Sequence, residues 1–441
     1  MTDPVSTLAA RLAATPYDAY VYAYPHKTAY GPLAPVRRLE DVWRDEATRG
    51  LSLYIHVPFC EMRCGFCNLF TTPNPPVEVV DRYVIALERQ AQRVAEALGD
   101  RTSYARFAIG GGTPTLLDAP ALARLLDVAE RAMGLDLTKT PGSVETSPET
   151  CSRESLDVLR GRGISRISIG VQSFVESESA AVLRPQKSVQ VFAAIDAIRQ
   201  AGFPVLNIDL IYGLPDQTEA SWERSLQTAL EWRPEELYLY PLYVRPVTSL
   251  SKRQRSWDDV RLSLYRQARD LLGAAGYEQV SMRMFQKKRP DASGPVYCVQ
   301  DEGMVGLGPG ARSYTRGLHY STEWAVSASG VRAILGSWLA DERFGEARWG
   351  FALDGDEQRR RWVAYALFTT DGLDLALYRA RFGSDLWSDL PMMKELTAAG
   401  AACVAGDRLT LTDLGLERSD TIGPWLYSSA VRSRMGAFLV R

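Results

Sequence analysis

Three of the six cysteines in this 441-residue chain lie within eight residues of one another. They are Cys60, Cys64 and Cys67, in the stretch YIHVPFCEMRCGFCNLFTT from Tyr54 to Thr72. Structural zinc sites normally present four ligands, and no second Cys or His pair follows nearby. Three thiolates on a four-iron cluster would leave one iron open to bind a substrate or a cofactor. The spacing therefore predicts such a cluster, against the alternative of three buried cysteines without a ligand.

The residues around these cysteines favour a loop over a buried strand. An arginine, a glycine and an asparagine stand between or just after them, and these residue types suit a compact turn. The other cysteines, Cys151, Cys298 and Cys403, are scattered singly, and we expect them to be small buried residues. Six cysteines in a chain of this length do not make a disulfide framework.

Composition points to a small-molecule partner. Charged residues make up 24% of the chain and the formal net charge is -2, so there is no electrostatic footprint for nucleic acid or an anionic membrane. The N-terminus lacks the basic segment and long apolar run of a signal peptide. No window approaches the ~20 apolar residues that span a bilayer. We therefore expect a soluble, cytoplasmic protein.

Short apolar runs rich in β-branched residues alternate with segments of helical periodicity. This rhythm predicts right-handed βαβ units and a parallel sheet, as an open partial barrel or a doubly wound sheet. Either fold gathers its chemistry at the carboxyl ends of the strands. The predicted strands are 51–57, 104–111, 142–147, 164–173, 204–213 and 236–242. The predicted helices are 79–97, 119–134, 152–162, 188–201 and 219–231.

The two ends of the chain depart from this rhythm. Residues 1–50 form an N-terminal arm with an aromatic run, and the alternation stops after about Gly330. The rest predicts helix, helix and a short hairpin around Gly406 and Asp407, a C-terminal unit of winged-helix appearance. Its candidate recognition helix carries a single lysine, so we expect a packing or lid domain and not a DNA-binding one. The predicted domains are 1–50, 51–325 and 326–441.

The C-x3-C-x2-C spacing, with aromatic Phe66 before the last cysteine, resembles the signature of the radical S-adenosylmethionine (SAM) superfamily. The wider phrase YIHVPFCEMRCGFC resembles the branch typified by oxygen-independent coproporphyrinogen III oxidase. The resemblance implies a partial (β/α)6 barrel related to the TIM barrel and a [4Fe-4S] cluster on the three cysteines. It also implies that the open iron chelates SAM, whose reductive cleavage yields a 5'-deoxyadenosyl radical, and that an electron donor such as flavodoxin or ferredoxin reduces the cluster.

Further segments match the family pattern in order, at the ends of the predicted strands. The glycines of GGGTPT let the backbone approach SAM. A carboxylate of the protein can accept hydrogen bonds from the ammonium group or the ribose hydroxyls of SAM, and an arginine can pair with the carboxylate of SAM. A Gly-Gly-Gly turn alone is weak evidence, and single carboxylates can be helix caps; the ordered matches over residues 51–313 favour the functional reading. The implied contacts of the first SAM are Tyr54, Phe66, Gly111, Gly112, Thr113, Glu145, Gln172, Arg184 and Asp209.

Members of this branch are associated with a second SAM in the same active site. By position in the family pattern, Tyr243 and Arg312 of GLGPGARSY fall where the second SAM is contacted. A plain glycine-rich turn is an equal alternative for GLGPG. The sequence assigns no catalytic proton donor or acceptor.

Two departures from the family pattern narrow the expected reaction. The porphyrin-decarboxylating members continue as C-x2-C-x-C, whereas Asn68 and Leu69 follow Cys67 here, and the His-Asn-x-x-Tyr-Trp motif of the heme chaperones is absent. What remains is a set of relatives that alkylate with two SAM molecules. We therefore expect methylation or cyclopropanation of an unsaturated small molecule, in natural-product (antibiotic) biosynthesis, with or without a methyltransferase-like ring-closing partner. The alternatives are coproporphyrinogen III oxidation and heme trafficking.

Four tyrosines of the N-terminal arm admit two readings. Tyr20, Tyr22, Tyr24 and Tyr30 could offer aromatic faces to a flat substrate, or form a strand packed on the bottom of the barrel. The arm also resembles the one that covers the active site of the decarboxylase, so a lid role is worth testing. His26 could relay a proton, although a lone histidine is more often structural.

Overall fold

The computed structural model describes residues 7–20, 23–244, 248, 250, 260–288 and 303–438. They form two compact units, each assembled from segments far apart in the sequence. The sheet unit comprises the described residues of Gly31–Asp259 and Tyr297–Ala352. The C-terminal unit comprises those of Met1–Tyr30, Val260–Val296 and Leu353–Phe438. The three-part division made from the sequence stays a prediction, and these units cut the chain at other places.

The sheet unit is built on parallel strands in chain order, as predicted. Its strand order is β1-β15-β14-β13-β12-β2-β5-β6-β7-β8-β9, and the pairs from β2 to β9 are all parallel. The order has two ends, so the sheet is an open, partial barrel. The predicted strands are observed as β2 (Leu51–Val57), β5 (Tyr104–Gly111), β6 (Gly142–Thr146), β7 (Ile164–Gln172), β8 (Val205–Tyr212) and β9 (Glu236–Pro241).

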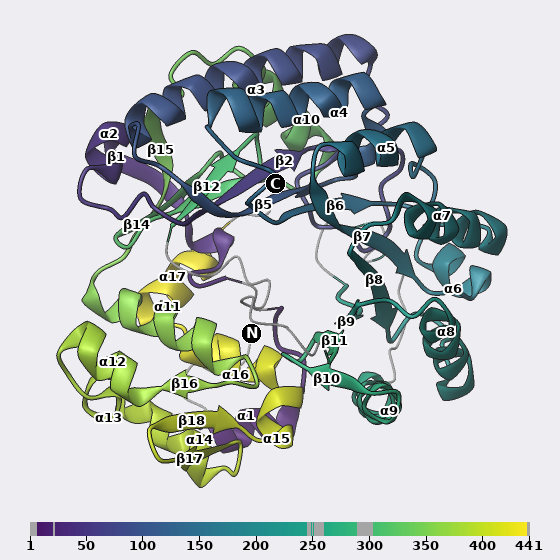
Figure 1. Ribbon diagram of the computed structural model, residues 1–441. Coiled ribbons are helices and arrows are strands. Elements are labelled where there is room, and N and C mark those ends of the chain that lie inside the picture. The colour runs from purple at the N-terminus through teal and green to yellow at the C-terminus, as the bar shows by residue number, and fades with distance from the viewer. Residues whose placement is uncertain are drawn as a thin grey trace. The chain divides into compact units, whose positions relative to one another are not determined.

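Helices cover the outer face of these strands (Figure 1). They are α3 (Val77–Leu98), α4 (Ala119–Asp127), α5 (Arg153–Gly161), α6 (Glu176–Ala181), α7 (Ser188–Ala201) and α8 (Glu219–Glu231). Side chains alternate between the two faces of a strand, so register tells which residues share a face. The outward set is apolar and at most 1% exposed, as at Leu53, Ile109, Val144, Ile167 and Ile208. Each such side chain stabilises the fold by about 1.5–3 kcal/mol when fully buried.

The sheet continues past the predicted barrel, which the sequence rhythm did not indicate. Strands β12 (Met304–Leu307), β13 (Arg312–Tyr314), β14 (Leu318–Ser321) and β15 (Glu346–Ala352) extend it beside β2, and β1 (Gly31–Arg38) pairs with β15. Two further helices, α2 (Leu39–Trp43) and α10 (Ala328–Leu339), belong to the same unit. These strands are short and mostly antiparallel, so they lack the strand-helix alternation that identified the others.

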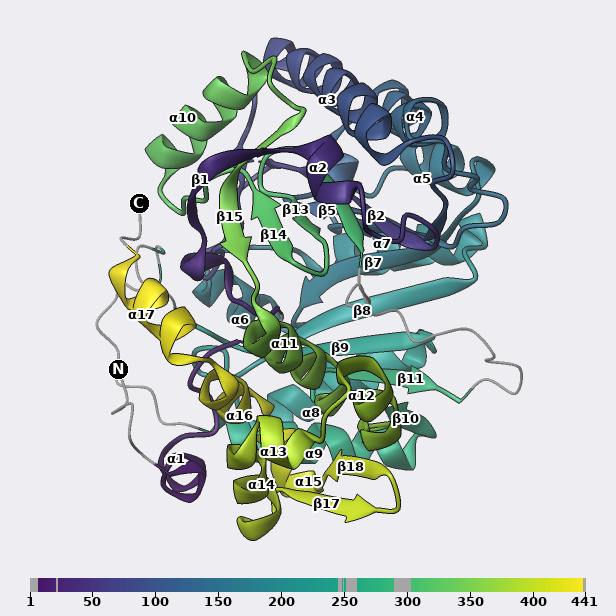
Figure 2. The same ribbon diagram turned by 90° about the vertical axis from the view of Figure 1, so that its left-hand side faces the viewer.

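The C-terminal unit contains the predicted helices and hairpin (Figure 2). Strands β17 (Ala402–Ala405) and β18 (Arg408–Leu411) form the hairpin, with Gly406 at φ +58°, and β16 (Leu373–Asp374) pairs with β18. Cys403 on β17 is exposed, so its predicted burial is wrong; Cys151 is half-buried and Cys298 lies outside the described residues. The other elements are α1 (Leu8–Ala14), α9 (Arg261–Ala274), β10 (Tyr277–Gln279), β11 (Met284–Lys287), α11 (Gly355–Leu367), α12 (Leu375–Phe382), α13 (Leu386–Asp389), α14 (Lys394–Ala398), α15 (Asp413–Glu417), α16 (Ser419–Leu426) and α17 (Ser429–Ala437).

The described N-terminal tyrosines belong to the C-terminal unit and do not form a strand. Tyr24 is fully buried, and its hydroxyl donates to Glu357 Oε2. Ser428 Oγ donates to the other carboxylate oxygen of Glu357 at 2.6 Å. The guanidinium of Arg283 lies 4.1 Å from the ring centre of Tyr20. The expected tyrosine strand is therefore wrong where the chain is described, and the expected aromatic faces toward a substrate stay a prediction; Tyr22 lies outside that part.

His26 and Tyr30 flank a short helical turn that contacts α17. His26 Nδ1 caps a short 3-10 turn, Lys27–Ala29, by accepting from the Thr28 amide at 3.3 Å, and Tyr30 is buried. His26 thus has a structural task. Among the described residues, no helix is both long enough and apolar enough to cross a membrane.

Candidate active site

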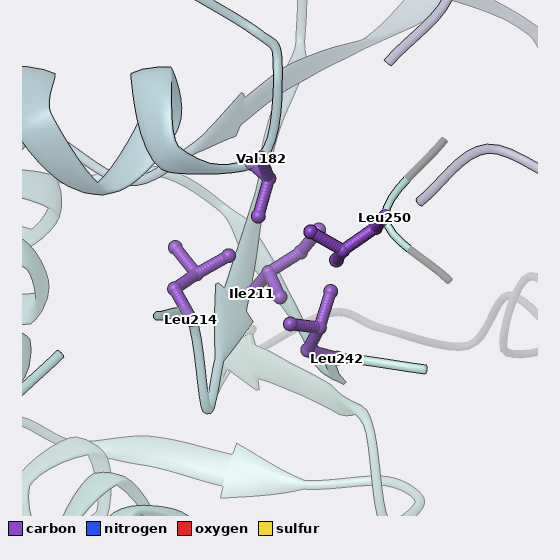
Figure 3. Close-up of a cluster of buried hydrophobic side chains, with 5 residues drawn as sticks. All are labelled: Val182, Ile211, Leu214, Leu242 and Leu250. Atoms are coloured by element: carbon purple, nitrogen blue, oxygen red, sulfur yellow. The ribbon is translucent and has the colours of Figure 1, made fainter. Parts of the chain in front are cut away.

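The cysteine loop begins where β2 ends and is fastened at its glycine. The Gly65 amide donates to the Val182 carbonyl at 2.8 Å, and the Gly65 carbonyl accepts from the Leu250 amide at 2.9 Å. A Cβ at Gly65 would lie 2.8 Å from the Val182 oxygen, so only glycine fits. Phe66 packs against a buried apolar cluster beside it, so this aromatic anchors the loop; Figure 3 shows the five buried side chains of the cluster. The cluster comprises Val182, Ile211, Leu214, Leu242 and Leu250.

The three thiols face one another from this loop. Burial is the main cause that raises the pKa of Cys60 to about 12, and charge repulsion from Cys67 adds to it. Burial also raises the pKa of Cys67, and charge repulsion from Cys64 adds to that increase. Bare thiolates are thus disfavoured here, and positively charged iron would reverse the balance because metal ligation deprotonates a thiol. Among the described side chains, no three His, Cys, Asp or Glu converge on a single ion. A cubane does not require this, since each thiolate binds a different iron, and the donor set fits a [4Fe-4S] cluster.

The glycine-rich turn after β5 packs directly on the cysteine loop. The Gly112 amide donates to the Val57 carbonyl and the Thr113 amide to the Phe59 carbonyl, each at 2.7 Å. A Cβ on Gly112 would overlap the Phe59 carbonyl and lie 2.8 Å from Cys60 Sγ. The Thr113 hydroxyl lies 3.8 Å from the same sulfur. These glycines therefore have a packing reason to be glycine, besides room for SAM.

Two predicted carboxylates meet on the inner, polar face of the sheet. The Gly111 amide donates to Glu145 Oε2 at 3.1 Å. Asp209 accepts from Asn207 Nδ2 at 2.7 Å and from Ser168 Oγ at 3.2 Å. Burial of the carboxyl, followed by the charge of Asp209, raises the pKa of Glu145 to about 7. The Glu145 residue is nevertheless exposed, so a ligand could reach it.

A buried ion pair lies on the same inner face. Arg166 Nε donates to Glu236 Oε2 at 2.7 Å, and another of its nitrogens donates to Ser143 Oγ at 2.9 Å. The positive charge of Arg166 opposes the rise in the pKa of both Glu145 and Asp209. The sequence analysis did not select Arg166, whose signal was a charged residue inside an apolar strand.

Gln172 and Arg184 come together beside the cysteine loop. Gln172 ends β7 with φ +69°, an uncommon value for a residue other than glycine. Arg184 Nη2 donates to the Gly170 carbonyl at 2.7 Å, and Nη1 lies 3.4 Å from Cys64 Sγ. Arg184 therefore joins the end of β7 to a cluster thiol, in addition to any role toward a ligand.

His56 is a site residue that the sequence analysis missed. The Tyr54 hydroxyl lies 3.1 Å from His56 Nδ1, and His56 Nε2 lies 2.9 Å from the Phe70 carbonyl. A carbonyl accepts only, so Nε2 carries the hydrogen and the Tyr54 hydroxyl donates to Nδ1. A Cβ on either Gly111 or Gly310 would lie 2.9 Å from this ring. Its position two residues after Tyr54, on the same face of the strand, was the available signal.

The two residues predicted for a second SAM also lie in the sheet unit. Met304 pairs with Ser52 on β2 and with Tyr314 on β13, so Tyr314 and Arg312 share the face that carries Tyr54. The Arg312 guanidinium lies 5.9 Å from the Tyr314 ring centre. Tyr243 follows β9 directly and is half-buried.

The sheet unit also contains a cavity of about 1140 Å³ that is separate from these residues. Ser313 and its partner Tyr320 line it, and both lie on the face opposite Arg312. Gln90 and Trp338, from α3 and α10, line it as well. Ser321 and Trp349, which share the face of Arg312, also line the cavity.

A parallel β/α sheet with a three-thiol loop and a glycine turn at its carboxyl edge defines a radical SAM protein. The sequence pattern of the radical SAM superfamily matches residues 54–229, and that of the HemN C-terminal domain matches residues 353–417. The chain is 30% identical over 394 residues to the oxygen-independent coproporphyrinogen III oxidase of Salmonella typhimurium, covering 83% of each chain. It is 28% identical over 373 residues to the heme chaperone HemW of Bacillus subtilis, covering 82% of this chain and 96% of that one.

The fold agrees with a solved structure of this kind. Coproporphyrinogen III oxidase (HemN) from Escherichia coli superposes with a TM-score of 0.78 at 24% identity, over 92% of this chain and 96% of that chain. The chain belongs to the radical SAM family that includes the oxygen-independent coproporphyrinogen III oxidases. Membership implies a [4Fe-4S] cluster and SAM, as the cysteine loop predicted.

The predicted methylation or cyclopropanation is wrong. The relatives that match over most of the chain are coproporphyrinogen III oxidases and heme chaperones, and none of those reported above is a methyltransferase. The inference rested on Asn68 and Leu69 after the third cysteine. Those residues follow a complete set of three cluster ligands, so replacing a cysteine there removes none of the ligands that the chemistry needs.

Proposed function

We propose that this chain oxidises coproporphyrinogen III without oxygen, by radical SAM chemistry. The observation that carries the proposal is the 30% identity to the Salmonella typhimurium oxidase across 83% of both chains, which includes the cysteine loop and the C-terminal unit. In such an oxidative decarboxylation a C–H hydrogen atom passes to the 5'-deoxyadenosyl radical, which becomes 5'-deoxyadenosine. The carboxylate then leaves as CO2, and one electron passes to an acceptor. A C=C bond then remains in the side chain.

The residues described above have separable tasks in this reaction. Cys60, Cys64 and Cys67 would hold the cluster, which when bound supplies the electron that cleaves SAM. Glu145 would bind the polar end of SAM, because the Gly111 amide holds its carboxyl group in place at the end of β5. Asp209, fixed by two hydrogen bonds, would accept from SAM hydroxyls.

The proposal includes a second SAM and an external electron donor. Arg312 supports the second SAM because register places it on the face that carries Tyr54, and Tyr243 follows the last strand of that sheet. Flavodoxin or ferredoxin would reduce the cluster. Equilibrium dialysis with labelled SAM should find two molecules per cluster-loaded chain and one in Arg312→Ala; one in both would count against the second site.

Heme trafficking is the second candidate, because the similarity to HemW spans 96% of that chaperone. The chain has three histidines, and none lies in GPVYCVQDEGMVGLGPG, which corresponds to the heme chaperone motif. A heme titration without a change in the Soret band would count against this candidate.

The deciding experiment uses anaerobic, cluster-reconstituted protein with SAM, a reductant and coproporphyrinogen III. The expected result is formation of CO2 and decarboxylated porphyrin, with methionine and 5'-deoxyadenosine in matching amounts. SAM cleavage without conversion of coproporphyrinogen III would be consistent with the radical chemistry and would refute the proposed substrate. A protein that holds iron and cleaves no SAM would refute both.

A further inference from the structure

The turn that presents Gln172 is strained. The Ser173 amide donates to the Val171 carbonyl at 2.9 Å, which closes a three-residue turn around Gln172 at φ +69°. Such γ-turns with a positive φ are rare and strained. The register between β7 and β8 also shifts here, between Gly170 and Gln172, and a bulge of this kind re-aims a side chain. A residue keeps a strained backbone conformation only when contacts with the surrounding structure hold it there.

Gln186 supplies that constraint. Its Nε2 lies 2.6 Å from the Val171 carbonyl and 3.0 Å from the Ser173 carbonyl, the two carbonyls that flank Gln172. The same nitrogen lies 3.3 Å from Ser179 Oγ. One side-chain amide thus bonds both sides of the strained residue without touching the Gln172 side chain.

A buried carboxylate holds the next residue of the turn. Ser173 is 1% exposed, and its hydroxyl donates to Glu178 Oε2 at 2.6 Å. Gln217 Nε2 donates to the same oxygen at 3.1 Å, and its own Oε1 accepts from the Gly213 amide at 2.7 Å. The turn after β7 is therefore tied to the turn after β8, while Gln186 bonds the two carbonyls that flank Gln172.

We propose that Gln186 is a positioning residue that holds Gln172 in the strained turn from which it contacts SAM. This rests on the proposed role of Gln172 toward SAM. If the clamp is lost, Gln172 populates unstrained conformations, and the apparent affinity for SAM falls by the fraction that stays competent. Losing two hydrogen bonds of ordinary strength corresponds to an affinity loss of about tenfold.

The test compares Gln186→Met with Gln200→Met, using cluster-loaded protein and no porphyrinogen. Methionine keeps the length of glutamine and removes its donors. Gln200 is an exposed residue of α7 whose side chain bonds Asp196 and Arg153. Calorimetry should give a SAM Kd about tenfold weaker for Gln186→Met and unchanged for Gln200→Met. Hydrogen exchange of residues 171–173 should accelerate in Gln186→Met alone.

A Gln172→Gly background separates positioning from general damage. Glycine adopts a positive φ without strain, so Gln186→Met should cause no further loss of SAM affinity there. A wild-type Kd in Gln186→Met, or the same tenfold loss in the glycine background, overturns the proposal. If Gln186→Met does not fold, recovery in the double variant supports the proposal and continued failure overturns it. Wild-type protein that binds SAM but leaves coproporphyrinogen III unchanged refutes the proposed substrate and not this inference.

Discussion

Replacing Gly112 with alanine should release the iron cluster while leaving the chain folded. The added Cβ would overlap the Phe59 carbonyl and lie 2.8 Å from both the Phe59 carbonyl carbon and Cys60 Sγ. Favourable contacts of this kind lie at about 3.5–4.0 Å, so the glycine turn and the cysteine loop must separate by about 1 Å.

The cost follows from what that separation breaks. Forcing an extra methyl into a packed region costs about 1–3 kcal/mol. The 2.7 Å hydrogen bonds from the Gly112 and Thr113 amides to the carbonyls of Val57 and Phe59 would be lost. Each loss costs about 1 kcal/mol. The total of about 3–5 kcal/mol lowers the population of the native loop by roughly two to nearly four orders of magnitude. A domain stability of about 5–15 kcal/mol can absorb this cost without unfolding.

The assay is iron per chain and visible absorption after anaerobic reconstitution. Wild type should hold about four irons and Gly112→Ala less than one. Gly161→Ala is the matched control, because a Cβ there meets nothing within 4 Å. Gly110→Ala should be intermediate: its Cβ would lie 2.9 Å from the movable Glu145 carboxyl, so the cluster stays and SAM binding weakens. Full iron and wild-type SAM cleavage in Gly112→Ala would refute this reasoning.

Three further predictions follow from the same structure. Cys64→Ala should abolish the visible absorption and the SAM cleavage, whereas Cys151→Ala, outside the loop, should retain both. The iron content of the two variants, measured after reconstitution, checks this prediction. The pKa of Glu145 is about 7, so acid protonates the carboxylate that accepts from SAM: affinity should rise as the pH increases through about 7, and a pH-independent profile is expected only in Glu145→Gln. Tyr24→Phe removes a buried hydrogen-bond donor to Glu357 and should lower the free energy of unfolding by about 1–3 kcal/mol. A changed KM at constant stability would instead indicate that the N-terminal tyrosines contact the substrate.

The parallel strands could be predicted from the sequence because each apolar run is local. Leu53 and Ile55 alternate with Tyr54 and His56, and a helical segment separates each strand from the next. The extension from β12 to β15 could not be read in this way. Met304 pairs with Ser52, a residue about 250 positions earlier, and no local pattern encodes such a partner.

The candidate site likewise contains residues that the sequence could predict and residues that it could not. The three cysteines were selected by their residue type and spacing. Glu145 and Asp209 were selected through the resemblance to a known family, because a carboxylate at a strand end matched its pattern. Gln186 and His56 have ordinary residue types, and their tasks exist only through contacts of 2.6–3.1 Å with other segments. A sequence without its tertiary contacts gives no reason to select Gln186.

The wrong expectation about the reaction has a physical explanation. The predicted cluster ligands, the glycine turn and the polar strand ends all lie in the sheet unit, and all were selected for contact with the cofactor. They are therefore compatible with every reaction that the cofactor can start. Asn68 directly follows the third cysteine, so it is also part of the cysteine loop and does not identify the substrate. Substrate choice must come from groups that contact the substrate, and a variant that changes turnover of coproporphyrinogen III while leaving SAM affinity and iron content intact would identify them.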